Sequence, residues 1–328
     1  GLLIFSVLAL FTTFGQDPTS TGLQSPSEFL GYEHGTYFSR HHQVIDYFED
    51  LEANSEGMLV VNEYGRTNEN RELILAYIST AENIENIDAI KEAHENGEAE
   101  EVAIVWMSYN VHGNESSATE AAMITAYELL ADHKDWLKDV VVIIDPCVNP
   151  DGRDRYVNWY NQKKNAQYNT NVNSVEHNEE WAAGRFNHYL FDLNRDWAWL
   201  TQLESQQRIA VYNDWLPHVH VDFHEQGINS PYYFAPAAEP MHEVISDWQK
   251  DFQTDLGRNH SNYFDDEGWL YFTSEIFDLV YPSYGDTYPT FNGAIGMTYE
   301  QGGSGDAGLG VVTEEGTELS LIDRIAHH

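Results

Sequence analysis

A His-x-x-Glu pair, His112 and Glu115, comes directly after an apolar run at 101–109. With this spacing on a tight turn or a first helical turn, an imidazole and a carboxylate face the same point and can share one ion. The pair alone is weak evidence, because Glu115 also suits the start of the helix that follows, where a carboxylate caps backbone N–H groups. A metal site therefore needs a third ligand from elsewhere in the chain.

The segment PHVHVDFHEQG offers that ligand. The two-residue period of a strand places His218, His220, Asp222 and His224 on one face. His224 alone lies at the carboxyl end of this strand, whereas His220 is expected to pack inside the sheet. Two imidazoles and one carboxylate leave a coordination position open for water, which is the arrangement of a catalytic zinc site. Zinc-bound water ionises near neutral pH and gives a usable nucleophile.

A polar pair, Asn194 and Arg195, lies within the segment DLNRDW. A guanidinium group is planar and matches a carboxylate, and an asparagine adds a neutral donor. The alternative is that Arg195 forms a surface ion pair, which is easy to arrange in a chain with 54 Asp and Glu residues.

The elements that must position these residues follow from the hydrophobic pattern. Helices are expected at 37–54, 116–133, 201–216 and 240–263, and strands at 59–65, 72–80, 101–109, 140–148, 218–224 and 293–300. The polar, Asn-rich segment 158–187 has no pattern and is expected to be a long surface loop. Because strands alternate with helices, we predict an α/β fold: a single domain with a mixed, mostly parallel twisted sheet and helices on both faces.

Four polar clusters come at the ends of predicted strands: HGNE, NPDG, HEQG and the Glu of TYEQGG. In open α/β sheets, ligand sites gather outside the carboxyl ends of the strands. We therefore expect the four clusters to converge on one cleft.

In this order, HGNE, NPDG, DLNRDW, the strand-ending His and YEQGG resemble the zinc carboxypeptidase family, the carboxypeptidase A-like metallopeptidases. The resemblance extends from roughly His34 to the last residue. It implies a zinc carboxypeptidase-like fold in which His112, Glu115 and His224 bind one Zn2+ per chain.

The same resemblance implies roles for residues outside the metal site. Asn194 and Arg195 grip the terminal carboxylate of the substrate, and Glu300 is the general base. Asp192 orients a zinc-bound His. Tyr284, on a mobile loop, covers the bound carboxylate, with Tyr281 and Tyr288 as rivals for this role.

Two positions stay open where the sequence departs from the family pattern. The cation that polarises the scissile carbonyl is one of Arg153, Arg155, Lys163 and Arg185, because the Asn-rich segment breaks the alignment. Asp286 lies in the divergent loop that sets specificity. It attracts a basic substrate side chain or simply makes a turn.

The resemblance implies a secreted zinc-dependent metallocarboxypeptidase that hydrolyses C-terminal residues from peptides, by means of a zinc-bound water and a Glu general base. Its partner is a peptide substrate with a free C-terminal carboxylate. One alternative is a zinc amidohydrolase of the same fold that acts on acyl-amino acids or cell-wall peptides. Another is a catalytically silent secreted binding module.

The net charge and the cysteine count exclude several classes of partner and of site. The formal net charge of −38 repels phosphate backbones and anionic lipid surfaces, so we expect no nucleic acid and no membrane among the partners of the mature form. The one cysteine, Cys147, excludes an internal disulfide and a multi-cysteine zinc cluster. We expect a monomer.

The apolar run 1–15 resembles a secretory signal peptide, followed by a linker at 16–30 and a zinc carboxypeptidase-like catalytic domain at 31–328. The protein is therefore expected to be secreted or periplasmic. No Met precedes the apolar run, and the segment LSLIDRIAHH lacks a helix cap, so we expect the sequence to be truncated at both ends.

Overall fold

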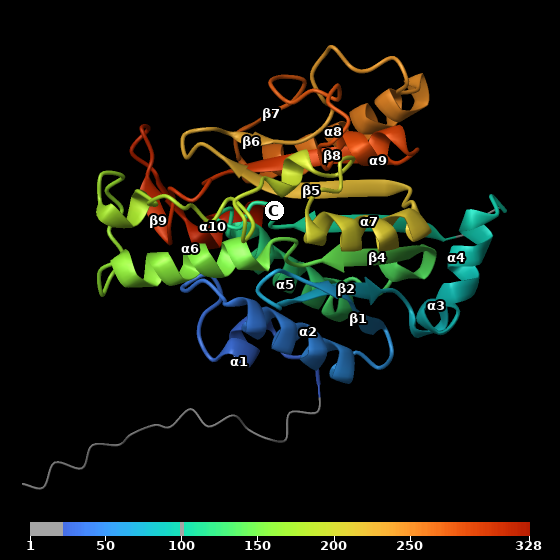
Figure 1. The fold of residues 1–328 in the computed structure, drawn as a ribbon, viewed down its shortest axis with the longest axis horizontal. Coiled ribbons are helices and arrows are strands. Elements are labelled where there is room, and N and C mark those ends of the chain that lie inside the picture. Colours follow the sequence, from blue (N-terminus) through green and yellow to red (C-terminus); the bar gives the residue numbers. More distant parts are fainter. Residues whose placement is uncertain (1–21, 99–101) are drawn as a thin grey trace, which may run out of the picture.

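Four parallel strands form the centre of the sheet in this computed structural model, which describes residues 22–98 and 102–328. β3 (Ala103–Tyr109) lies between β4 (Val140–Asp145) and β5 (Val219–Gln226), and β8 (Ile295–Gly302) pairs with the other side of β5 (Figure 1). β3 and β4 are long apolar runs of the sequence, as expected of strands that are buried on both faces. The predicted signal peptide and residues 16–21 of the predicted linker lie outside the described residues.

Further strands extend both edges of the sheet. β1 (Leu59–Arg66) and β2 (Glu72–Ile78) form an antiparallel pair that joins β4, and β6 (Tyr232–Tyr233) and β7 (Tyr271–Phe272) follow β8. Within the described residues the sheet therefore has eight strands in the order β1-β2-β4-β3-β5-β8-β6-β7. A separate pair is formed by β9 (Gly310–Val312) and β10 (Glu318–Ser320). The predicted mixed α/β architecture is confirmed.

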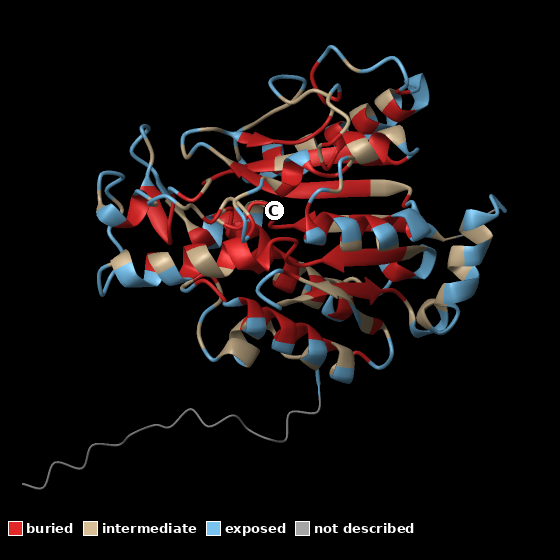
Figure 2. Cartoon of the chain, viewed as in Figure 1, coloured by how far each residue is buried: buried red, intermediate tan, exposed pale blue. Residues whose placement is uncertain are grey.

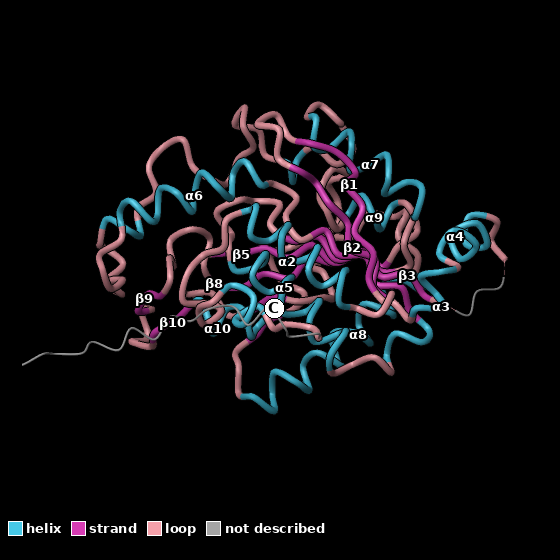
Figure 3. Tube along the Cα trace, turned by 90° about the horizontal axis from the view of Figure 1, so that it is seen from below, coloured by secondary structure: helices cyan, strands magenta, loops and turns pink. Residues whose placement is uncertain are grey.

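Helices cover both faces of this sheet, and Figure 3 shows α7 and α8 on opposite sides of the strands. The α-helices of the described residues are α1 (Pro26–Leu30), α2 (His41–Asn54), α3 (Ala81–Glu85), α4 (Ile87–Glu95), α5 (Ser117–Ala131), α6 (Pro150–Lys163), α7 (Leu203–Trp215), α8 (Asp247–Glu267), α9 (Thr287–Phe291) and α10 (Leu321–His327). Short 3-10 turns lie at Trp136–Asp139, Val175–His177 and Leu193–Arg195.

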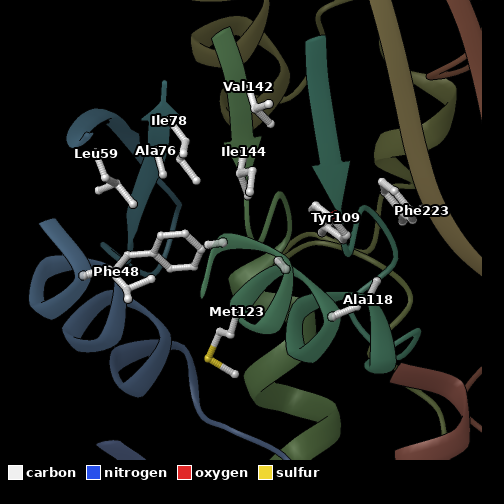
Figure 4. Packing of buried hydrophobic residues seen from close by; sticks show 14 of the residues in the cluster. Phe48, Leu59, Ala76, Ile78, Tyr109, Ala118, Met123, Val142, Ile144 and Phe223 are labelled. Carbon is white, nitrogen blue, oxygen red and sulfur yellow. The ribbon is translucent and has the colours of Figure 1, made fainter. Parts of the chain in front are cut away.

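The two faces of the sheet carry separate hydrophobic clusters. On one face, Phe48 of α2 and Met123 of α5 pack with Ile144 of β4 (Figure 4). On the other face, Trp106 of β3 packs with Tyr212 of α7, with the ring centroids 5.0 Å apart. Burial of both faces makes the central strands the rigid part of the molecule, and Figure 2 shows them as mainly buried.

Two segments predicted as irregular contain helix. Residues 26–30 of the predicted linker form α1; Ser25 and Glu28 make a capping box there, and Leu30 packs against the core. The predicted loop at 158–187 is wrong at 158–163, the end of α6. Asn149 caps this helix by accepting from the Gly152 N–H, and a proline at the first helical position is favourable.

Helix α8 lies further along the chain than the predicted helix at 240–263. Ser246 caps its start, and Gly268, in a left-handed conformation, ends it. Among the described residues, no helix combines the length and the apolar character needed to span a bilayer.

Candidate functional site

The three predicted metal ligands meet at the carboxyl ends of β3 and β5. The Nδ1 atom of His112 is 2.8 Å from Glu115 Oε1, and the Nδ1 atom of His224 is 2.8 Å from Glu115 Oε2. The two Nδ1 atoms are 3.2 Å apart, and all three side chains are buried. One ligand atom from each of the three residues lies within 4.8 Å of the other two, so the sheet brings together two nitrogens and a carboxylate from separate segments.

The Nε2 atom of each imidazole, on the side of the ring away from Glu115, lies beside a carboxylate. His112 Nε2 is 2.9 Å from Asp192 Oδ1, and His224 Nε2 is 3.0 Å from Asp222 Oδ2. A proton on each Nε2 leaves a lone pair on each Nδ1, and these lone pairs point toward Glu115. Lone pairs and a carboxylate that share one point repel each other unless a cation joins them, so this set fits a metal ion such as zinc.

The electrostatics of the ligands agree with a cation site. Burial lowers the pKa of His224, but Asp222 and Glu115 raise it well above its ordinary range. Burial would raise the pKa of Glu115, but the neighbouring imidazoles hold it below its usual value. A positive charge is therefore favourable at the buried point where the side chains of His112, Glu115 and His224 meet.

Glu300 lies beside the predicted metal ligands because β8 pairs with β5 in parallel. His224 is the register partner of Glu300. The carboxyl group is mostly buried, and its Oε2 atom has no hydrogen-bonding partner among the described residues. Burial raises the pKa of Glu300 to about 8. The side chain therefore offers a carboxyl group that exchanges a proton near neutral pH.

A cavity of about 370 Å³ opens over these groups. Its lining includes His112, Glu115, Arg185, Asn194, Arg195, Tyr284, Asp286, Thr298 and Glu300. Of the four polar clusters that were predicted to converge, three do so: HGNE, HEQG and TYEQGG. NPDG instead forms the start of α6, where Asp151 and Arg153 are buried and point into other contacts.

The Asn194–Arg195 pair forms one wall of the cavity. The Asn194 Oδ1 atom accepts a hydrogen bond from the Gly285 N–H at 2.8 Å, which fixes the orientation of the amide. The Arg195 guanidinium carbon lies 4.5 Å from the centre of the Tyr284 ring. A cationic fork at the side of a cavity is suited to bind a carboxylate.

Of the three candidate tyrosines, only Tyr284 lines this cavity. The Tyr281 hydroxyl accepts from Trp199 Nε1 at 2.7 Å, and Tyr288 donates to Asn213 at 3.1 Å. Ser283 accepts from the Ala198 N–H and donates to the Arg195 carbonyl. The loop that carries Tyr281, Ser283 and Tyr284, here called the tyrosine loop, is therefore hydrogen-bonded to the segment that carries Arg195.

The contacts of the four candidate cations show which of them lies at the cavity. Arg153 is buried against Glu120, and Arg155 donates to backbone carbonyls. Lys163 forms a surface ion pair with Glu180. The remaining candidate, Arg185, lines the cavity and lies 3.2 Å from Glu115 and 3.0 Å from Asp192.

Asp286 also lines the cavity rather than only making a turn. It is buried and accepts from Thr298 Oγ1 at 3.0 Å. Burial raises its pKa. A cavity wall with this carboxyl group is suited to a cationic side chain.

Two carboxylates near the metal ligands were not assigned a role from the sequence. Asp222 contacts His224, and Glu225 accepts from the Ser117 N–H and pairs with Arg324 at 3.1 Å. Strand alternation had placed Asp222 on the face of His224, and this was the available signal. Another group of acidic residues with a His, at Glu69, is neutralised by Arg71.

Comparison with protein families matches residues 44–269 to the zinc carboxypeptidase family. A search of curated proteins finds no match.

Three solved structures that share this fold are named as carboxypeptidases. The metallo-carboxypeptidase from Burkholderia cenocepacia superposes with a TM-score of 0.60 and 18% identity, over 88% of this chain and 65% of that one. The carboxypeptidase A from Helicoverpa armigera gives 0.59 and 15%, over 85% and 66%. The metallo-carboxypeptidase from Pseudomonas aeruginosa, in complex with (2-guanidinoethylmercapto)succinic acid, gives 0.54 and 13%, over 86% and 65%. This chain thus spans slightly less than two thirds of each, and the likeness concerns the fold.

Proposed function

Because the chain belongs to the zinc carboxypeptidase family, we propose that it is a secreted zinc metallocarboxypeptidase that removes residues from the carboxyl ends of peptides. One observation carries the proposal: two imidazoles and a carboxylate converge beside a cavity, and two members of this group, His112 and Glu115, line the cavity together with Arg195 and Glu300. The apolar segment 1–15 supports export, to the periplasm or the medium.

Zinc held by His112, Glu115 and His224 would supply a Lewis acid that polarises a carbonyl and makes water acidic. Glu300 accepts a proton from the attacking water and returns it to the leaving amine. A pKa raised to about 8 suits both halves of this transfer, since a group poised near the working pH is a competent base and acid.

The polar wall of the cavity selects and orients the substrate. Arg195 binds the terminal carboxylate of the peptide through a charge-assisted fork, and Tyr284 closes over it. Arg185 places a positive charge beside the reacting carbonyl, where it stabilises the developing oxyanion. Fixing the end of the peptide makes the hydrolysis exopeptidic.

Basic terminal residues are the proposed substrates, because Asp286 lines the same cavity. The P. aeruginosa structure supports this choice, since the compound bound to that carboxypeptidase carries a guanidine group. The net charge of −38 also attracts cationic peptides.

The test is incubation with mixed free-acid peptides and their amidated counterparts, followed by mass spectrometry, with a chelator-treated control. Single residues lost only from free-acid peptides, and only with metal, would support the proposal. An acyl-amino acid and a cell-wall peptide assayed in parallel identify the amidohydrolase alternative. A folded, zinc-loaded protein that leaves all of these intact would contradict enzymatic activity and favour a silent binding module.

A further inference from the structure

We propose that Asp222 is a positioning residue that fixes the tautomer and orientation of His224 as a metal ligand, and that Gly285 is required to leave room for it. The inference rests on the proposed zinc function. Asp222 is fully buried on β5, two residues before His224, and its Oδ2 atom is 3.0 Å from His224 Nε2.

The position of the proton on His224 decides which nitrogen of its ring can bind a metal. Its Nδ1 atom faces Glu115 and His112, so a metal bound there requires a lone pair on Nδ1. A neutral imidazole then carries its proton on Nε2, and this buried N–H needs an acceptor.

Two side chains contact Nε2, and one of them is excluded as the acceptor. The Asn194 Nδ2 atom is 3.2 Å from Nε2, but an amide nitrogen is a donor. The Asn194 amide cannot turn its oxygen toward the ring without losing the hydrogen bond from the Gly285 N–H to Oδ1. Asp222 Oδ2 lies 3.0 Å from Nε2 without being aligned for a hydrogen bond, and neither oxygen of this buried carboxylate has a hydrogen-bond partner among the described residues. Asp222 is thus the acceptor available to His224 when Nε2 carries the proton.

Gly285 completes the arrangement through its lack of a side chain. A Cβ atom at this position would lie 1.8 Å from Asp222 Oδ2 and 2.9 Å from Trp197 Nε1. The same residue thus holds Asn194 through its N–H and leaves space for the Asp222 carboxylate. An alanine here would displace Asp222 while keeping its charge.

The sheet supplies a matched control. Ser108 of β3 is the register partner of Asp222 on β5 and of Asp145 on β4. Asp145 is also fully buried, but it accepts from the Tyr64 hydroxyl at 2.9 Å and contacts no metal ligand. Asp145→Asn therefore reports what the loss of a buried carboxylate does to the sheet alone.

The experiment measures the zinc dissociation constant by competition with a chelator, independently of peptide hydrolysis. We expect Asp222→Ala and Gly285→Ala to weaken zinc binding roughly 10- to 100-fold, as for other partners of metal-bound histidines. Asp222→Asn should have a smaller effect because its amide oxygen can still accept, and Asp145→Asn should leave the constant within twofold of wild type. Thermal unfolding of each metal-free variant separates local effects from global destabilisation.

A spectroscopic measurement tests the tautomer directly. In zinc-saturated protein labelled with 15N-histidine, we expect slowly exchanging Nε2–H signals from both His112 and His224. Asp222→Ala should remove the signal of His224 and keep that of His112. Wild-type zinc affinity in Asp222→Ala, or equal weakening by Asp145→Asn, would overturn the inference but leave the proposed enzyme intact. A wild-type protein that binds no zinc would overturn both.

Discussion

His224 and Glu300 are register partners on the adjacent parallel strands β5 and β8. The proposed metal ligand and the proposed proton carrier are therefore held at a separation set by the spacing of two strands, about 4.8 Å. A slip of one residue in this register would turn Glu300 to the opposite face of the sheet.

Replacement of Glu300 by Gln should reduce kcat by roughly 100-fold or more, because the amide cannot accept the proton of the attacking water. Zinc content should stay at the wild-type value, since Glu300 is not one of the converging ligands. Steady-state kinetics and metal analysis of the same preparation test both parts. Substantial activity in the variant would remove Glu300 from this role.

Replacement of Arg195 by Ala should lower kcat/KM for free-acid peptides by about 10- to 100-fold, the cost of one or more charge-assisted hydrogen bonds. Any slow cleavage of amidated peptides should not change, because these lack the carboxylate. Arg195→Lys should recover only part of the loss, since an ammonium group lacks the planar fork. Equal losses on both substrate classes would argue for a structural role.

Replacement of Trp199 by Ala should raise KM about 3- to 10-fold with little change in zinc affinity. Trp199 is 56% exposed and donates to Tyr281, whose ring lies 4.8 Å from that of Tyr284. Aromatic contacts of this kind contribute about 0.5–1.5 kcal/mol, so their loss loosens the tyrosine loop. Trp136→Ala is the matched control, because Trp136 is 59% exposed and stacks on His133 instead. A similar change in KM for the control would contradict the prediction.

Replacement of Asp286 by Asn should reduce kcat/KM for peptides ending in Lys or Arg by about 10- to 100-fold relative to peptides ending in Leu. The substitution keeps the size of the side chain and an acceptor for Thr298, so the fold should persist. Competition between the two peptides in one reaction measures the ratio directly. An unchanged ratio would place the determinant of specificity elsewhere on the cavity wall.

Acidification should destabilise the fold through His41. This residue is 4% exposed, contacts the Glu72 carbonyl at 2.7 Å, and burial lowers its pKa to about 4. Between its unfolded pKa near 6.5 and the folded value, only the unfolded chain takes up the proton. The contribution of His41 to stability is thus complete above pH 6.5 and is lost as the pH falls toward 4.

Urea unfolding at pH 7 and at pH 4.5 tests this contribution, which is on the order of 2–3 kcal/mol. His41→Gln keeps a donor for the Glu72 carbonyl and does not titrate, so its loss of stability on acidification should be smaller than that of wild type. Equal losses in the two proteins would rule out His41 as the source.

The sequence predicted those elements whose hydrophobic pattern reflects their burial in the fold. Apolar runs predicted β3 and β4, and two-residue alternation predicted β5. The carboxyl ends of β3 and β5 predicted where His112 and His224 would meet, because parallel strands end at one edge. The start of α6 was missed although Asn149 and Pro150 carry the cap signals, since NPDG also suits a turn.

The choice among the four cations could not be made from the sequence. Arg185 follows an irregular segment whose course depends on close backbone contacts: a Cβ at Gly113 would lie 2.5 Å from the Gly184 carbonyl oxygen. Contacts of this kind have no periodic signature. Asp222 was correctly placed on the face of His224, but its role depends on Asn194 and Gly285, which are distant in sequence.

The residues proposed for the chemistry and those proposed for selectivity come from different parts of the chain. The ends of β3, β5 and β8 carry the metal ligands and Glu300, while Tyr284 and Asp286 belong to the loop before α9. Mutations at Tyr284 and Asp286 that retain Gly285 can reshape the preference for a terminal residue during evolution while the strands preserve the reaction. Exchanging these two positions between homologues is therefore a practical route to engineered variants that cut at other termini.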